Sequence, residues 1–192
     1  MPQIIHERPE DAALIEPLLD ECFGPERFTK TAYKIRENIH SLPELSFVIR
    51  DGDKLVATIR YWPITIGDMS PALLLGPIAV EPTLQGQGLG ISLIRQSLQI
   101  AIELGHKIIV LVGDPEYYGQ FGFDAASPKG LQLPGPVEDR RFLVKECEQG
   151  ALRNVSGVIA GGSMPDMTAG RNADLSETEQ LITRLAAFAP PA

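Results

Sequence analysis

The sequence predicts an α/β (α+β) fold with a central, mixed and mostly antiparallel sheet flanked by helices. Apolar segments at 45–50, 55–66 and 73–80 follow one another closely, and 51–54 (Asp-Gly-Asp-Lys) has the composition of a hairpin turn. A glycine-rich turn comes next, followed by a helical apolar period and by a further apolar strand at 107–112. We therefore expect antiparallel strands to lead into a central strand, which a helix connects to the strand after it.

Periodicity and breakers also predict the elements on either side of this unit. Strands are expected at 3–7, 123–126 and 141–148, helices at 11–23, 28–40, 89–104 and 114–121, and an additional edge strand at 152–159. Asp114 followed by Pro115 is a typical helix start, with an N-cap residue and a proline at the first helical position. Pro17 should kink the first helix or divide it into two pieces, because an internal proline removes a backbone hydrogen bond.

Two prolines fall inside predicted strands, where proline is confined to edges and bulges because it cannot donate a ladder hydrogen bond. Trp62-Pro63 therefore predicts a bulge or an early end in the strand 55–66. Gly76-Pro77 lies in the central strand, and a fully paired strand would reject proline there. It predicts either a bulge at which the central strand separates from its neighbour or an edge strand with a break.

Residues 1–160 are predicted to form one domain, long enough for a core of its own. Residues 161–175 are glycine-rich and polar without periodicity, so we interpret them as a flexible linker or loop. Residues 176–192 are predicted to be an amphipathic helix that begins with the capping box Ser176-Glu177-Thr178-Glu179. Its apolar stripe must pack on its own domain or on a second chain, so a homodimer stays open.

Composition and charge exclude several classes of protein. The chain of 192 residues has a formal net charge of −8 and a sequence pI near 4.9, which disfavours nucleic-acid binding and suits a cationic amine substrate. No apolar run approaches the roughly 20 residues of a membrane helix, and the N-terminus lacks the form of a signal peptide. A cytoplasmic protein without membrane contact is therefore expected. The two cysteines form no C-x-x-C pair and the three histidines are well separated, so no metal site is expected.

The glycine-rich turn, Gln85-Gly86-Gln87-Gly88-Leu89-Gly90, leads to the first chemical prediction. Glycines at alternate positions let the backbone approach a ligand closely, and the helix after them exposes unpaired N–H groups and the positive end of its dipole. This arrangement suits a phosphate or pyrophosphate. The spacing does not match a Walker loop, because Gly90 is followed by Ile91 instead of lysine. It does not match a dinucleotide fingerprint either, because Ile91 occupies the third glycine position.

Two motifs in this part of the chain are similar to those of one family. The segment 85–90 matches the Q/R-x-x-G-x-G/A signature of the GNAT superfamily of acetyl-CoA-dependent N-acetyltransferases, and Val80-Glu81-Pro82 resembles the V-x-P that often precedes it. The segment 118–123 (Tyr-Gly-Gln-Phe-Gly-Phe) resembles the family's second motif, Tyr-x-x-Leu/Phe-Gly-Phe. The resemblance covers roughly residues 3–156 in layout. It implies a sheet splayed between its fourth and fifth strands by a bulge in the fourth, which opens a slot for the pantetheine arm.

The resemblance implies an acyltransferase that moves an acetyl group from acetyl-CoA to a primary amine of a small molecule or protein, by direct attack in a ternary complex and without a metal. The backbone N–H of Ile78 would polarise the acetyl carbonyl, and Tyr118 is expected to be the general acid for the departing thiolate. Its neighbour Tyr117 is expected to point elsewhere and to serve as a control. The expected cofactor-binding residues are Ile78, Ala79, Val80, Gln85, Gly86, Gln87, Gly88, Leu89, Gly90 and Ile91.

The general base is the least defined role. Some members of the family place a glutamate in the fourth strand, and Leu74 occupies that position here, so this base is absent. Glu81 at the end of the strand is a weak candidate, acting directly or through water, although a solvated loop carboxylate is the other interpretation. Asp68, His40 and Glu116 are weaker options.

Two other functions stay open from the sequence. A non-catalytic acyl-CoA-binding or regulatory module would use the same fold; the missing strand glutamate allows it and the presence of Tyr118 disfavours it. An unrelated nucleotide-binding domain would bind ATP or NAD in place of CoA, and the failed spacings count against it. The sequence does not specify the acceptor amine or the length of the acyl group.

Overall fold

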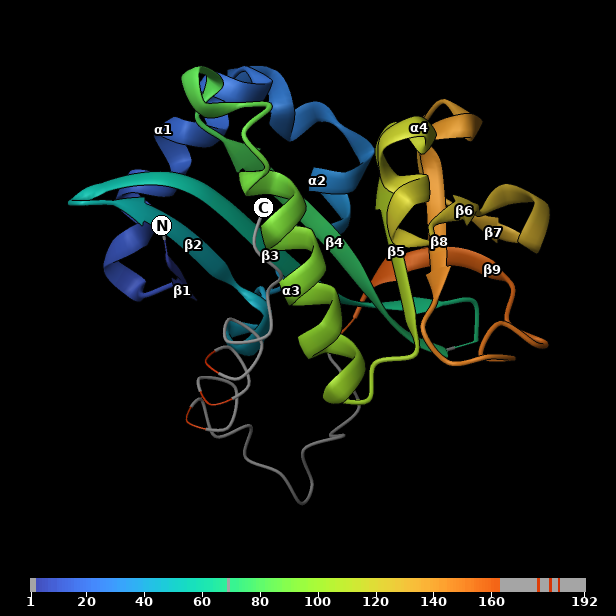
Figure 1. Ribbon diagram of the computed structural model, residues 1–192. Coiled ribbons are helices and arrows are strands. Elements are labelled where there is room, and N and C mark those ends of the chain that lie inside the picture. Colours follow the sequence, from blue (N-terminus) through green and yellow to red (C-terminus); the bar gives the residue numbers. More distant parts are fainter. Residues whose placement is uncertain (1–2, 69, 163–175, 177–179, 181–182, 184–192) are drawn as a thin grey trace.

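The computed structural model describes residues 3–68, 70–162, 176, 180 and 183, and shows a mixed sheet with helices on both faces (Figure 1). The strands are β1 (Gln3–His6), β2 (Phe47–Asp51), β3 (Lys54–Ile66), β4 (Ser70–Val80), β5 (Ile108–Val112), β6 (Asp124–Ala125), β7 (Leu131–Gln132), β8 (Phe142–Glu146) and β9 (Gly157–Gly161). Their order is β1-β2-β3-β4-β5-β8-β6, with β9 beside β3 and β7 beside β9. The pairs are antiparallel except for β4–β5 and β7–β9. The predicted fold class is confirmed.

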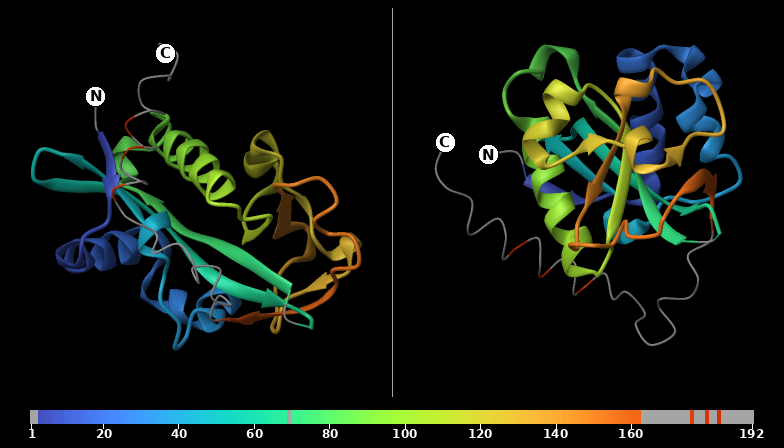
Figure 2. Two further views of the ribbon diagram at one scale, coloured as in Figure 1. Left: turned by 90° about the horizontal axis from the view of Figure 1, so that it is seen from below. Right: turned by 90° about the vertical axis from the view of Figure 1, so that its right-hand side faces the viewer.

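The helices form a layer on each side of this sheet. They are α1 (Ala12–Phe23), α2 (Thr31–Ile35), α3 (Leu89–Glu103) and α4 (Pro115–Tyr118). Short 3-10 helices cover Pro9–Asp11, Pro25–Thr29, Pro43–Leu45, Pro82–Leu84, Gly119–Phe121, Ser127–Lys129 and Asp139–Arg141. Figure 2 shows α3 on one face of the sheet and α1 and α2 on the other. Within the described part of the chain, no helix has both the length and the apolar character needed to cross a membrane.

The central strands divide their side chains between these two layers. In β2, Phe47 and Ile49 pack in the apolar cluster that includes α3, whereas Val48 packs with α1. This alternation is the period-2 pattern of a strand covered on both faces. From α3, Leu93 and Ile94 are fully buried in the same cluster. The sheet is therefore held from both sides along the strands that lead to β4.

The pairing around β4 is interrupted at the position predicted from Gly76-Pro77. Along β3 and β4, the register passes from Ile59↔Ile78 to Tyr61↔Leu75, so three steps in β4 oppose two in β3. This is a bulge with its extra residue in β4. On its other edge, β4 pairs with β5 only at Leu73 and Leu74. Beyond these residues the two strands diverge, as Figure 1 shows, and the predicted splay is confirmed.

Several local predictions were wrong. Pro17 does not divide the first helix into two pieces, because its solvent-exposed position costs a single backbone bond while the buried Ile15, Leu18 and Leu19 anchor the continuous helix α1; a kink at Pro17 stays a prediction. The predicted helix 28–40 is limited to α2, with a 3-10 segment before it. Trp62-Pro63 neither ends nor bulges β3. Both residues pair in regular register, and the irregularity lies between Ile59 and Tyr61, with its extra residue in β4.

The C-terminal predictions fall mostly outside the described residues. Gly161 ends β9, so the predicted linker begins after this residue, and 163–175 lie outside the described part. Of the predicted helix 176–192, only Ser176, Gln180 and Thr183 are described, and each is helical and exposed. The packing of that segment, and hence the homodimer, stays a prediction.

Replacing the fully buried Leu93 with alanine should lower the free energy of unfolding by about 2–5 kcal/mol, because the substitution removes buried apolar atoms and leaves a cavity under α3. Urea denaturation followed by circular dichroism measures the change. Ile102→Ala is the matched control, because Ile102 is on the same helix but 36% exposed, and its loss should be clearly smaller. Equal losses in the two variants would contradict the orientation of α3.

Candidate active site

A cavity of about 790 Å³ opens where β4 and β5 separate. This volume lies in the range of about 300–1,000 Å³ that is typical of small-ligand sites. Three walls come from β4 (75–78 and Val80), from the loop and start of α3 (84–86 and 88–91), and from the end of β5 with the loop and helix α4 after it (111–114, 117 and 118). The remaining lining comes from two distant segments, with Phe23, 30–33 and Arg36 from the first and 136–138 and Arg141 from the second. The cavity thus lies between the two halves of the splayed sheet.

The edge of β4 presents unpaired backbone groups to this cavity. The Glu81 N–H donates to the Val56 carbonyl of β3 at 2.9 Å, which fixes the direction of alternate residues along the strand. Because neighbouring residues of a strand point their N–H and C=O groups to opposite edges, the Ala79 groups face β3 and those of Ile78 and Val80 face away from it. On that side β5 has already diverged, so the Ile78 and Val80 N–H groups point into the open slot.

The glycine loop continues this line of donors. Gly86 and Gly88 have φ of 79° and 84°, which favours glycine, and nothing lies within 4 Å of the position a Cβ would take on either residue. Gly88 is the N-cap of α3, and the first bond of the helix runs from the Ser92 N–H to the Gly88 carbonyl at 2.9 Å. The N–H groups of residues 89–91 therefore precede that bond and have no partner within the helix.

Two tyrosines close the opposite wall. Tyr118 is packed edge-on against Phe123, with ring centroids 6.0 Å apart, and against Tyr117, with centroids 5.1 Å apart. Burial raises the pKa of the Tyr118 phenol, and Tyr117 and Asp114 add to this effect, so the phenol keeps its proton at neutral pH. Tyr117 was expected from the sequence to point away from the site, and this prediction was wrong. Tyr117 also lines the cavity, and its hydroxyl lies 3.2 Å from where a Cβ on Gly90 would stand.

A family model agrees with this geometry. The model of the Acetyltransferase (GNAT) family matches residues 12–123, more than half of the 192 residues. The chain belongs to the GNAT family. The resemblance seen in the sequence motifs is therefore confirmed.

Relatives and solved structures of this family cover most of the chain. The uncharacterized N-acetyltransferase YhbS of Escherichia coli K12 is 28% identical over 155 residues, which are 80% of this chain and 92% of that protein. The uncharacterized N-acetyltransferase YjhQ of the same strain is 30% identical over 133 residues, which cover 67% of this chain and 74% of that protein. The crystal structure of E. coli YhbS in complex with CoA has a TM-score of 0.72 and 27% identity, covering 84% of this chain and 89% of that one. A GNAT acetyltransferase from Brucella melitensis in complex with acetyl-CoA has a TM-score of 0.64 and 26% identity, covering 85% and 97%.

Most of the residues predicted for cofactor binding in this GNAT chain line the cavity. They are Ile78, Val80, Gln85, Gly86, Gly88, Leu89, Gly90 and Ile91, and Tyr118 lies opposite them. The Gln85 side chain donates to the Val80 carbonyl at 3.1 Å and ties the loop to the end of β4. Ala79 and Gln87 are not part of the lining: the Ala79 side chain is buried in the cluster with α1, and Gln87 is exposed. Direct contact of Ala79 with a ligand in the slot is therefore disfavoured.

The geometry also disfavours Glu81 as a base. Its carboxylate is paired with Lys54 at 2.6 Å and accepts a hydrogen bond from the Thr83 hydroxyl at 2.9 Å. Hydrogen bonds from Lys54 and Thr83 lower the pKa of the Glu81 carboxyl, which makes it a weaker proton acceptor. Glu81 is not a lining residue of the cavity.

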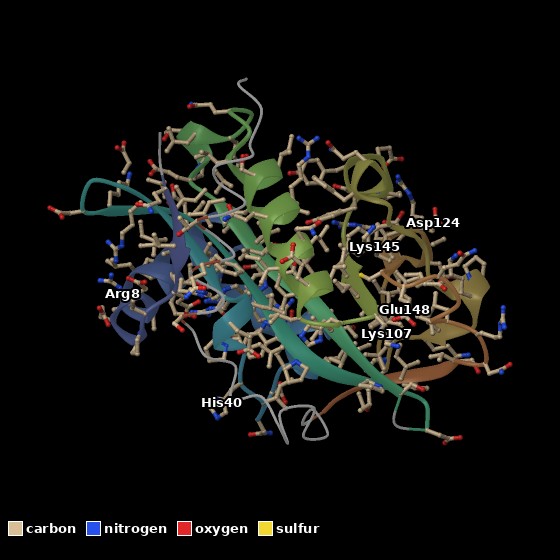
Figure 3. The ribbon with its side chains drawn as sticks, turned by 60° about the horizontal axis from the view of Figure 1, so that its bottom comes forward. Arg8, His40, Lys107, Asp124, Lys145 and Glu148 are labelled. Atoms are coloured by element: carbon tan, nitrogen blue, oxygen red, sulfur yellow. The ribbon has the colours of Figure 1, made fainter. Side chains whose placement is uncertain are left out.

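The weaker base candidates lie outside the cavity as well. Asp68 and His40 are exposed, and Figure 3 shows His40 at the periphery of the molecule. Glu116 is 2.6 Å from Arg140 at the surface. Among the described residues, the carboxylates that line the cavity are Asp114 and Glu138. Sequence reasoning proposed neither of them as a base. Asp114 was interpreted only as a helix N-cap, and nothing in the local sequence places Glu138, in the segment before β8, at the cavity.

Asp114 was expected to cap the short helix, but it makes no side-chain cap bond. Its carboxylate instead lies 3.4 Å from the Arg141 Nε. Arg141 and Arg36 were also missed as lining residues, and no sequence signal distinguishes them from surface arginines. Gly113, directly after β5, was missed too. A Cβ there would overlap the Tyr118 ring, so glycine makes room for this tyrosine.

Gly113→Ala should lower the free energy of unfolding by about 1–3 kcal/mol and displace Tyr118, because the added methyl overlaps its ring. Urea denaturation gives the first quantity, and near-ultraviolet circular dichroism reports the second. Gly119→Ala is the matched control, since nothing lies within 4 Å of its Cβ position and its φ of −57° suits alanine. If Gly113→Ala is as stable as Gly119→Ala, the placement of Tyr118 against residue 113 is wrong.

Proposed function

We propose that this GNAT protein is an N-acetyltransferase that moves an acetyl group from acetyl-CoA to a primary amine by direct attack in a ternary complex. The observation that carries this proposal is the slot between β4 and β5, into which the Ile78 and Val80 N–H groups point. The CoA and acetyl-CoA complexes of the two similar structures support the choice of co-substrate.

The residues at the slot fit this co-substrate. The glycine loop has open space over Gly86 and Gly88 and three unpaired N–H groups at the start of α3, which suits a pyrophosphate. The Ile78 and Val80 backbone groups suit strand-like pairing with the pantetheine amides. When bound, acetyl-CoA supplies the activated acetyl group: a new C–N bond replaces its C–S bond, while the amine loses one proton and the thiolate gains one.

Two groups would then assist the reaction. The Ile78 N–H is preorganised, because β4 is fixed by β3 and by packing on both faces, and it would donate to the carbonyl oxygen as charge develops there. Tyr118 lies on the other wall with its proton retained, so its phenol is suited to donating a proton or a hydrogen bond to the departing sulfur.

The amine must be neutral before it attacks, since an alkylammonium has a pKa of about 10.4. Asp114 and Glu138 are the described carboxylates that line the cavity, and we propose that one of them receives this proton, directly or through water. Glu138 is the freer of the two, because its cation, Arg140, is 3.8 Å away and both side chains are more than half exposed.

Acetyl-CoA should raise the melting temperature by roughly 5–10 °C at a hundredfold excess over its Kd, which corresponds to about 2.7 kcal/mol of added stability. ATP and NAD should not do so. In Gly88→Glu the rise in melting temperature should be lost, because the new carboxylate would occupy the space that the phosphates of acetyl-CoA require. Differential scanning fluorimetry measures all of these shifts.

Gly150→Glu is the matched control for this variant. Its φ of 86° is close to the 84° of Gly88, and nothing lies within 4 Å of either Cβ position, so backbone strain is similar in both variants. Gly150 is not a lining residue of the cavity, so Gly150→Glu should keep the shift. No shift with acetyl-CoA or any other CoA ester in the unchanged protein would reject the proposed co-substrate.

Tyr118→Phe should lower kcat about 10²-fold or more without changing the Kd for acetyl-CoA, because it removes only the proton donor. Release of the CoA thiol, followed with a disulfide reagent over a panel of primary amines, measures kcat. Tyr117→Phe is the comparison, since this phenol lines the same cavity but faces Gly90. A larger loss of kcat in Tyr117→Phe than in Tyr118→Phe would make Tyr117 the proton donor in place of Tyr118. Binding of acetyl-CoA without turnover of any amine would favour a non-catalytic acyl-CoA-binding module.

A further inference from the structure

Arg36, at the C-terminal end of α2, is a buried cation in the cavity wall without an anionic partner in the described part of the chain. Its side chain lines the cavity and only 9% of the residue is exposed. Among the described residues, no carboxylate lies within 4.0 Å of its guanidinium, and its buried Nε has no hydrogen-bond partner. A buried charge without a partner is costly, so proteins usually pair it.

The other buried arginines follow that rule. Arg27 is paired with Glu16 and Asp20, the latter at 3.2 Å. Arg60 is paired with Glu7 at 2.7 Å through two nitrogens. Arg36 therefore differs from both, because none of the described carboxylates pairs with it although it lines the cavity.

The surroundings of Arg36 hold the guanidinium in place without neutralising it. Its central carbon lies 4.9 Å from the centroid of the Tyr33 ring and 5.7 Å from that of Trp62. Trp62 is fixed in turn, because its Nε1–H donates to the Gly76 carbonyl at 2.7 Å. Burial lowers the pKa of Arg36 to about 10, so the group is still charged at neutral pH. Two aromatic faces and a rigid strand thus hold a charged guanidinium in the wall of the cavity.

Arg36 lies at the end of the slot that is remote from the glycine loop. Its Nη2 is 3.2 Å from the position that a Cβ on Gly76 would take, so glycine at the bulge makes room for it. Along β4, Gly76 precedes Ile78, whereas Val80 and the loop at 85–91 follow it. An anion bound by Arg36 is therefore not the pyrophosphate held by the loop. It belongs to whatever occupies the cavity beyond the Ile78 N–H.

We propose that Arg36 binds a carboxylate of the acceptor, and that the acceptor is a small amino acid, with its amine close to its carboxylate. This inference rests on the proposed acetyl transfer and adds its substrate class. The planar fork of a guanidinium matches a carboxylate with two parallel hydrogen bonds. The amine is acetylated at nitrogen, and the carboxylate takes no part in the bond changes.

The remaining charges of the cavity wall do not satisfy Arg36. Asp114 lies beside Arg141 at 3.4 Å, and the cation nearest Glu138 is Arg140. Lys30, the other cation of the wall, is exposed and makes no ion pair with the described residues. The glycine loop lines the same cavity of about 790 Å³, so this volume must hold parts of acetyl-CoA as well as the acceptor, which favours a small molecule over a protein.

Matched pairs of amines with and without the carboxylate test this proposal. We would compare L-lysine with cadaverine, L-phenylalanine with phenethylamine, and β-alanine with ethylamine, by release of the CoA thiol. Alanine amide represents a peptide N-terminus, and phosphoethanolamine represents a different anion. The carboxylated member of at least one pair should have a kcat/KM about 30-fold or more above that of its partner and of both other probes.

The variants Arg36→Gln and Arg36→Lys locate the effect. Arg36→Gln should lower kcat/KM for the preferred amino acid by about 30-fold or more, mainly through KM, and leave that of the decarboxylated amine unchanged. Arg36→Lys should restore part of the loss, because it keeps the charge and loses the fork. Arg153→Gln is the matched control, since Arg153 is exposed, lies outside the cavity wall and does not pair with Asp114 or Glu138. Thermal shifts with acetyl-CoA confirm that each variant is folded and binds the co-substrate.

The outcomes separate this inference from the function on which it rests. Equal or better turnover of the decarboxylated amines or of alanine amide, with acetyl-CoA bound, overturns the carboxylate site and leaves the acetyltransferase intact. A preference for phosphoethanolamine overturns the carboxylate in favour of a phosphate. If acetyl-CoA does not bind, the proposed function fails. The Arg36 site is then decided by the NMR signal of its guanidinium Nε–H, which must shift when the amino acids are added. No shift overturns the site.

Discussion

β4 and β5 pair only at Leu73 and Leu74, and the site is built on the point where this pairing stops. The bulge at Gly76-Pro77 turns the later part of β4 away from its neighbour, so its edge N–H groups lose their ladder partners. Such groups are costly when buried without a partner and useful when they face a ligand. The strand cannot relax back onto β5, because β3 holds its other edge and α1 and α3 pack on its two faces.

The same constraint joins the strand to the helix that follows it. The unpaired donors of Ile78 and Val80 continue into those of residues 89–91, and the Gln85 side chain bridges the two sets through the Val80 carbonyl. A long ligand with amides at one end and phosphates at the other would find donors along its whole length. Glycine at 86 and 88 is needed because both positions have φ near 80°, where a side chain would add strain.

Features encoded locally could be predicted from the sequence. The bulge follows from a proline in a central strand and the loop follows from glycine spacing, so the splay was predicted correctly, and most of the residues predicted to bind the cofactor line the cavity. Arg36, Gly113 and Glu138 were missed because their roles arise from contacts between segments distant in the chain, which composition and period do not encode. The helix 28–40 was overestimated since helical periodicity alone does not show where tertiary packing ends a helix; α2 stops at Ile35.

Charge adds a constraint on the acceptor that geometry alone does not supply. The chain has a net charge of −8, which favours the approach of cations, yet Arg36 leaves a positive charge unsatisfied inside the cavity. An acceptor with a net negative charge would be repelled by the phosphates of acetyl-CoA in the same cavity, and a simple polyamine would meet a buried guanidinium of the same sign at the end of the slot. A zwitterion avoids both penalties, because it has no net charge at a distance and presents each end separately at close range. The carboxylate can then pair with Arg36 while the amine faces the carboxylates of Asp114 and Glu138, which line the same cavity.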